Sequence, residues 1–191
     1  MSDTAAPAPL RIEIETSAQT AAVDALVLAA FGPGRFAKTA ERLRESAGDM
    51  TGFVVRDSGR LIGSVRLWAI RIGDTPALFL GPIAVDADCR KAGLGADLVQ
   101  ACVDHAARIG AGILLVGDMG YFGRFGFAVA PHVRLPGPVD RARVLWLGEG
   151  EPTGPVSTAA TKTRSGESGS RPAVTSVICD VKDRPRAGLR P

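Results

Sequence analysis

The sequence predicts one mixed α/β (α+β) domain, built around a sheet of about seven strands that pair mostly antiparallel. Its 191 residues are enough for a compact domain with a well-buried core. Strand-like and helix-like segments follow one another in the order β-α-α-β-β-β-α-β-α-β-β, and the sequence has no internal repeat. Three of the strands are consecutive and joined by short turns, which predicts an antiparallel meander.

The spacing of apolar residues places the elements of the first half. A strand is expected at 11–15, an amphipathic helix at 17–31 and a more charged helix at 36–47. The strands of the meander are expected at 51–57, 61–72 and 77–85.

A polar loop at 86–92 opens the second half and leads into a long helix at 93–109. A buried strand at 113–116, helical turns at 121–125 and strands at 127–130 and 141–147 are expected to follow. The domain is expected to span residues 1–150. Residues 151–191 are rich in Ser, Thr, Pro and Gly, which predicts a largely flexible tail. Within it, 173–181 can form a late strand, and the sequence leaves this open.

The charge distribution excludes the usual footprint of a nucleic-acid binder. Residues 1–150 carry 16 basic and 16 acidic side chains, so the net charge of +3 comes from the tail. Nucleic-acid binders instead cluster their positive charge on a folded surface. We therefore expect no nucleic-acid partner.

Other classes of protein and site are also disfavoured. Three widely spaced cysteines and two histidines lack the spacing of a zinc site, so no metal is expected. The sequence has no apolar run long enough for a membrane helix, and its N-terminus lacks the pattern of a signal peptide. These features predict a cytoplasmic protein without a membrane partner.

The most informative segment is 78–100, where a strand, a polar loop and the start of a helix follow one another. The first four N–H groups of a helix lack partners within it, and together with the helix dipole they form an anion site. Glycine allows an anion to approach the backbone closely. The segment therefore predicts a pyrophosphate site made by Arg90, Lys91, Ala92, Gly93, Leu94, Gly95 and Ala96.

Three kinds of pyrophosphate motif can be compared with this segment. The P-loop pattern G-x-x-x-x-G-K-[ST] is absent, and a Rossmann fingerprint would need a third glycine where Leu98 stands. The pattern Arg/Gln-x-x-Gly-x-Gly/Ala is satisfied by Arg90, Gly93 and Gly95. This resembles the acetyl-CoA-binding motif of the GNAT superfamily of N-acetyltransferases.

The surrounding elements extend the resemblance over roughly residues 9–148. The family places a meander before the motif and a helix, a strand and a short helix after it. Its ending, an aromatic residue followed four and five residues later by Gly-Phe, appears here as Phe122 and Gly126-Phe127. The resemblance implies a GNAT-type fold, with helices on both faces of the sheet and a splayed pair of strands that binds CoA.

The resemblance also implies how the cofactor is held. The pantetheine arm lies between the splayed strands, where Ile83, Ala84 and Val85 offer backbone groups. The N–H near Ile83 is the expected donor to the thioester carbonyl, and residues 90–96 hold the pyrophosphate. Pro82 cannot donate a backbone hydrogen bond, which indicates an irregularity in the strand at that point.

The catalytic groups are less well defined. Many family members protonate the leaving thiolate with a tyrosine, but that position is Phe122, which is expected only to contact the cofactor. Tyr121 lies one residue earlier, about 100° around a helix, and is either the acid or a packing residue. Asp118 is either the general base or the N-cap of the short helix.

The resemblance therefore implies an acetyl-CoA-dependent N-acetyltransferase. Its acceptor would be the primary amine of a small molecule or peptide, which attacks the thioester directly in a ternary complex. The alternative is an acyl-CoA-binding sensor or interaction module with little catalysis. The sequence does not identify the acceptor, and homodimers are common among similar proteins.

Overall fold

The fold is described from a computed structural model, which describes residues 10–32, 43, 49–159 and 179–180. Residues 36–47, where a second helix is expected, lie outside this range except for the helical Leu43. No helix in the described part of the chain is long and apolar enough to cross a membrane.

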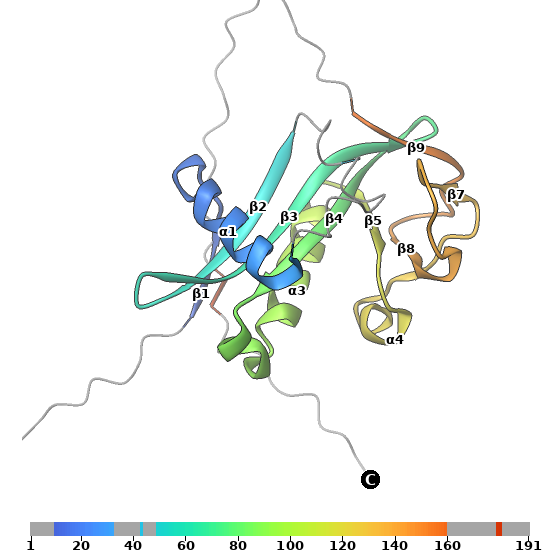
Figure 1. Cartoon of the computed structure of the whole chain (residues 1–191). Helices are drawn as coiled ribbons and strands as arrows, with labels where there is room; N and C mark the ends of the chain where they lie inside the picture. The colour runs from blue at the N-terminus through green and yellow to red at the C-terminus, as the bar shows by residue number, and fades with distance from the viewer. Residues whose placement is uncertain (1–9, 33–42, 44–48, 160–178, 181–191) are drawn as a thin grey trace, which may run out of the picture.

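Most elements lie where the sequence predicts them (Figure 1). The helices are α1 Thr20–Phe31, α3 Leu94–Arg108 and α4 Met119–Phe122, with 3-10 turns η1 Ser17–Gln19, η3 Ala87–Ala92, η4 Gly123–Phe125 and η5 Arg141–Arg143. The strands are β1 Arg11–Ile14, β2 Met50–Asp57, β3 Arg60–Ile72, β4 Thr75–Val85, β5 Gly112–Val116, β6 Ala128–Val129, β7 Val133–Arg134, β8 Val144–Leu147, β9 Gly154–Thr158 and β10 Cys179–Asp180.

The strands form a mixed and mainly antiparallel sheet in the order β10-β1-β2-β3-β4-β5-β8-β6, with β9 added beside β3 and β7 beside β9. The parallel pairs are β4 with β5 and β7 with β9. The expected meander is confirmed, because β2, β3 and β4 pair antiparallel in sequence order. The fold class predicted from the sequence is therefore correct, although the described residues form ten strands rather than about seven.

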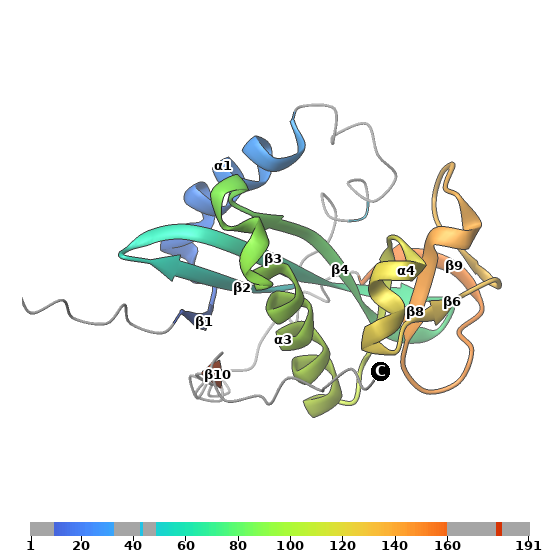
Figure 2. The same ribbon diagram turned by 90° about the horizontal axis from the view of Figure 1, so that it is seen from below.

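Helices cover both faces of the sheet (Figure 2). On one face, α3 buries Leu98, Val99 and Cys102 against strand residues such as Val55 and Leu115. On the other face, Val23 and Val27 of α1 pack on Val54 and Ala84. Val54 and Val55 are neighbours whose side chains point to opposite faces, as the two-residue period of a strand requires.

An ion-pair cluster around the buried Arg66 links α1 to the sheet. The Arg66 guanidinium in β3 is almost fully buried and donates from Nε to Glu15 Oε2 at 2.9 Å and from Nη1 to Asp24 Oδ1 at 2.7 Å. Asp24 belongs to α1, and Glu15 directly follows β1. Because Nη2 also donates to Glu15 Oε1 at 2.5 Å, the Arg66–Glu15 pair is bidentate and fixes the end of β1 on β3. The single bond to Asp24 links α1 to the same guanidinium.

Two strands lie in the segment where a tail is expected. β9 pairs antiparallel with β3 through Ile70, Arg71 and Ile72, and Val156 is buried in the core. β9 is not among the strands predicted from the sequence. Of the possible late strand at 173–181, Cys179 and Asp180 are described, and they form β10 against β1.

Candidate functional site

β4 and β5 separate along the second half of their length. Their parallel pairing covers Ala77 to Phe79 of β4 and Gly112 to Leu114 of β5. β4 then continues to Val85, while β5 ends at Val116 and is paired with β8 along its other edge (Figure 1). The splayed pair of strands expected from the family resemblance is therefore present.

The register on the other side of β4 determines which backbone groups face this opening. Asp86 N–H donates to the Ile62 carbonyl of β3, and the antiparallel pairing places Ala84 opposite Ser64. Since successive N–H groups of a strand point to opposite sides, Ala84 N–H also points toward β3. The N–H groups of Ile83 and Val85 point away from β3, toward the opening. Ile83 therefore fits the expected role of donor, whereas a backbone contact from Ala84 does not fit this register.

The irregularity predicted at Pro82 is confirmed. The register between β3 and β4 shifts between Val65 and Leu67, opposite the segment that contains Pro82. The indole Nε1 of Trp68 donates to the Gly81 carbonyl at 2.7 Å. A proline in a central strand is tolerated at such a bulge because no regular ladder bond is lost there.

The start of α3 lies at the end of the opening. Gly93 is its N-cap and has a φ of +78°, a left-handed conformation that favours glycine. Its carbonyl accepts from Ala96 N–H at 2.8 Å and from Asp97 N–H at 3.2 Å. The N–H groups of Leu94 and Gly95 have no acceptor within α3, as at any helix start. The Leu94 side chain is buried in the core, so only its backbone could take part in a site.

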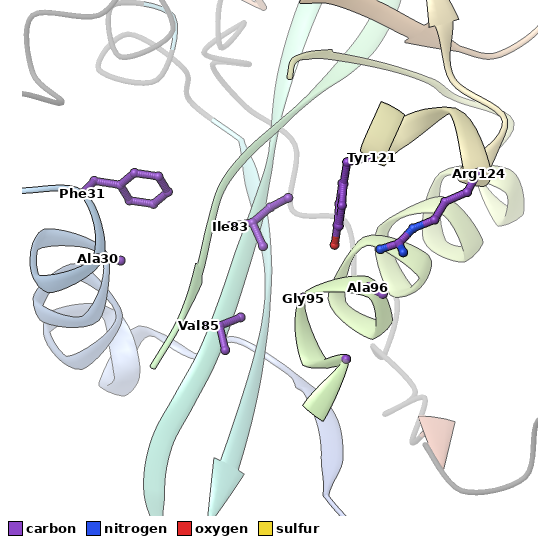
Figure 3. Close-up of a pocket in the computed structure, with 9 residues that line it drawn as sticks. Ala30, Phe31, Ile83, Val85, Gly95, Ala96, Tyr121 and Arg124 are labelled. Atoms are coloured by element: carbon purple, nitrogen blue, oxygen red, sulfur yellow. The ribbon is translucent and has the colours of Figure 1, made fainter. Parts of the chain in front are cut away.

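A pocket of about 420 Å³ lies between β4, the start of α3 and α4 (Figure 3). It is lined by Ala30, Phe31, Ile83, Val85, Gly93, Gly95, Ala96, Tyr121 and Arg124. Five of the predicted cofactor-binding residues are in this set: Ile83, Val85, Gly93, Gly95 and Ala96. The backbone of Arg90, Lys91 and Ala92 forms the end of η3, directly before Gly93.

Of the two neighbouring aromatic residues of α4, Tyr121 lines the pocket and Phe122 does not. A Cβ atom placed on Gly95 would lie 3.5 Å from the Tyr121 hydroxyl, so this hydroxyl is directed at the first turn of α3. The Phe122 ring packs edge-on against Phe127, with centroids 5.9 Å apart, and occupies the space beside Gly117. Its predicted contact with the cofactor stays a prediction.

Asp118 is the N-cap of α4. Its Oδ1 accepts from Tyr121 N–H at 3.0 Å, and its side chain is exposed rather than part of the pocket lining. The structure thus brings Asp118 to the helix that carries Tyr121, and it supports the capping alternative of the sequence analysis.

Arg124 also lines the pocket and is not among the site residues predicted from the sequence. Its guanidinium carbon lies 4.1 Å from the centroid of the Tyr121 ring and 4.8 Å from that of Phe125. The available signal was a basic residue directly before Phe125-Gly126-Phe127, within the motif already recognised.

Comparison with known proteins agrees with this geometry. The sequence model of the acetyltransferase (GNAT) family matches residues 20–127, more than half of the chain. The chain belongs to the GNAT acetyltransferase family. A curated relative, the uncharacterized N-acetyltransferase YhbS of Escherichia coli K12, is 31% identical over 148 residues, which cover 73% of this chain and 87% of YhbS.

Solved structures of this family share the fold. The crystal structure of Escherichia coli YhbS in complex with CoA has a TM-score of 0.67 and 25% identity, covering 81% of this chain and 93% of YhbS. A GNAT acetyltransferase from Brucella melitensis in complex with acetyl-CoA has a TM-score of 0.61 and 24% identity, covering 79% of this chain and 96% of that one.

Proposed function

We propose that this GNAT protein is an acetyl-CoA-dependent N-acetyltransferase that acts on a primary amine of a small molecule or peptide. The observation that carries the proposal is the opening between β4 and β5, which has the Ile83 N–H on one side and the start of α3 at its end. The complex of the related YhbS with CoA supports this choice of donor.

The cofactor would bind along β4 like an additional strand. Its pantetheine arm would follow Ile83 and Val85, whose N–H groups point away from β3. Its diphosphate would lie at the first turn of α3, where Gly93 and Gly95 present no side chain and the helix dipole favours an anion. This places the thioester near the bulge at Pro82.

The chemistry needs one bond to form and one to break. The neutral amine nitrogen attacks the thioester carbon, and the carbonyl oxygen gains negative charge that the Ile83 N–H would stabilise. A single fixed donor of this kind contributes about 3 kcal/mol in comparable enzymes. The carbon–sulfur bond then breaks, CoA thiolate leaves, and the surplus proton on the new amide nitrogen passes to water or a base.

Tyr121 is the candidate proton donor to the departing thiolate, because it is the tyrosine of the pocket lining. Its hydroxyl, which is directed at Gly95 in this structure, would turn toward Ile83 to deliver the proton to sulfur and would then recover one from solvent. Asp118 would act through α4 as a positioning residue, since its carboxylate is bonded to the Tyr121 N–H. A role for Asp118 as general base stays a prediction that substitution can test.

Two measurements test the proposal. Isothermal titration with acetyl-CoA should give saturable binding at micromolar concentrations, and failure to bind at high micromolar ligand would refute the assignment of the donor. Thiol release from acetyl-CoA should then be followed with a panel of small-molecule and peptide amines. Turnover that depends on one class of amine would confirm a transferase.

One observation favours a second function, that of an acyl-CoA-binding sensor with little catalysis. The position of the usual family acid is Phe122, and the carboxylate of Asp118 is engaged as a helix cap. This second function predicts tight binding of acetyl-CoA with no amine-dependent thiol release. Robust turnover on any amine would eliminate it.

A further inference from the structure

Arg124 holds a positive charge at the pocket in a fixed position. Its guanidinium stacks on two aromatic rings, 4.1 Å from the Tyr121 centroid and 4.8 Å from the Phe125 centroid. Stacking of this kind keeps a long side chain in one orientation, so little conformational entropy remains to be lost when a ligand binds.

Arg124 has no salt-bridge partner within residues 10–32, 43, 49–159 and 179–180. The residues of the pocket lining that the structure describes include no carboxylate either. The arginines of the ion pairs in this part of the chain, such as Arg66 with Glu15, are by contrast neutralised within the fold. The charge of Arg124 is therefore left available to an anionic ligand.

The orientation of the Arg124 side chain shows which part of the pocket its guanidinium faces. Figure 3 shows the Arg124 guanidinium extended over the start of α3, on the side of Ala96. Gly95 and Ala96 form the pocket wall there, and the Tyr121 hydroxyl is directed at Gly95. A helix start and a guanidinium thus direct positive potential at the same space, which suits a ligand with more than one negative oxygen.

We propose that Arg124 binds the diphosphate of the acyl-CoA donor, with its guanidinium donating to the phosphate oxygens that lie at the first turn of α3. This rests on the proposed function. The stack on Tyr121 and Phe125 presents the guanidinium to the ligand, so the short helix α4 and η4 contribute to anion binding as well as to the shape of the pocket.

The test compares wild type with Arg124→Gln by isothermal titration with acetyl-CoA and with 3′-dephospho-acetyl-CoA. The variant should bind both compounds about tenfold or more weakly, and by the same factor, because both carry the diphosphate. The factor should shrink when the salt concentration is raised from about 0.05 M to about 0.5 M, since ionic interactions at exposed sites are screened. Arg108→Gln, an equal change of charge at the far end of α3, should bind as wild type does.

Each other outcome overturns the inference in a recognisable way. Unchanged affinity would mean that Arg124 makes no contact with the donor. A loss seen with acetyl-CoA alone would move Arg124 to the 3′-phosphate. A loss that is independent of salt would mean that Arg124 acts only by packing on Tyr121. Wild-type protein that binds neither compound would instead refute the proposed function itself.

Discussion

Substitution of Gly95 by aspartate would separate folding from binding at this site. A Cβ atom at position 95 would lie 3.5 Å from the Tyr121 hydroxyl and 3.8 Å from Val85 Cγ2, both ordinary contact distances. Gly95 is also the second residue of α3, where an acidic side chain stabilises a helix by about 0.3–1 kcal/mol. The Gly95→Asp variant should therefore fold with unchanged or slightly increased stability.

The same substitution should strongly weaken the binding of acetyl-CoA, although it leaves the stability unchanged or slightly increased. If the diphosphate lies at the first turn of α3, the new carboxylate would stand ~5 Å from it. At an effective dielectric constant of about 20, each pair of unit charges at that separation repels by about 3 kcal/mol. One such repulsion alone lowers the affinity for acetyl-CoA on the order of 100-fold, and the diphosphate carries two charges, so the affinity should fall at least that far.

Gly95→Asn provides the matched control, because it has nearly the same shape without the charge. Titration calorimetry with acetyl-CoA at two salt concentrations measures the difference between the two variants, and thermal melting checks that both are folded. Equal affinities for the Asp and Asn variants would show that no anionic group of the donor lies near Gly95, and the assignment of the diphosphate site would fail.

Three further predictions concern catalysis and stability. Tyr121→Phe should lower the rate of amine-dependent thiol release about 100-fold at unchanged affinity for acetyl-CoA; an unchanged rate would mean that the thiolate leaves without an acid. Asp118→Ala should cost about 1 kcal/mol of stability through the lost N-cap, whereas Asp118→Asn should retain both stability and turnover; an Asn variant that is stable but inactive would identify a catalytic carboxylate. Burial, together with the charge of Arg108, lowers the pKa of His105, which packs against Phe53. The folded state therefore prefers neutral His105, so this contribution to stability is present above about pH 6.5 and is lost as pH falls through the lower folded pKa. Urea unfolding at pH 7.5 and pH 5 should accordingly show a smaller loss of stability in His105→Gln than in wild type, and equal losses would contradict the shift.

Local features of the sequence predicted most of the fold. The two-residue period of the meander strands and the 3.6-residue period of α3 are patterns of residues close together in the sequence. Turn residues such as Ser58-Gly59, between β2 and β3, mark where one strand ends and the next begins. β9 was missed because its short Gly-Pro-Val-Ser-Thr segment has no strong period of its own. What makes it a strand is the exposed edge of β3 at Ile70–Ile72, which no local pattern reveals.

At the candidate site, too, some features follow from local sequence and others only from tertiary contacts. The spacing of Arg90, Gly93 and Gly95 predicted where an anion would meet the helix start, because the chemistry of a glycine-rich N-terminus is local. The register of β4 was not predictable from its own residues. It follows from the pairing of Asp86 with Ile62 across the meander, and it turns Ile83 N–H to the opening and Ala84 N–H away from it.

The sequence by itself determined the family, the position of the glycine-containing turn before α3 and the presence of two adjacent aromatic residues before Gly126-Phe127. Only the tertiary structure decided which of these two faces the pocket. Neighbouring residues of a helix point about 100° apart, and the orientation is fixed by distant packing. The ring of Phe122 fills the space beside Gly117 and Phe127, which leaves Tyr121, with Arg124 stacked on it, at the pocket.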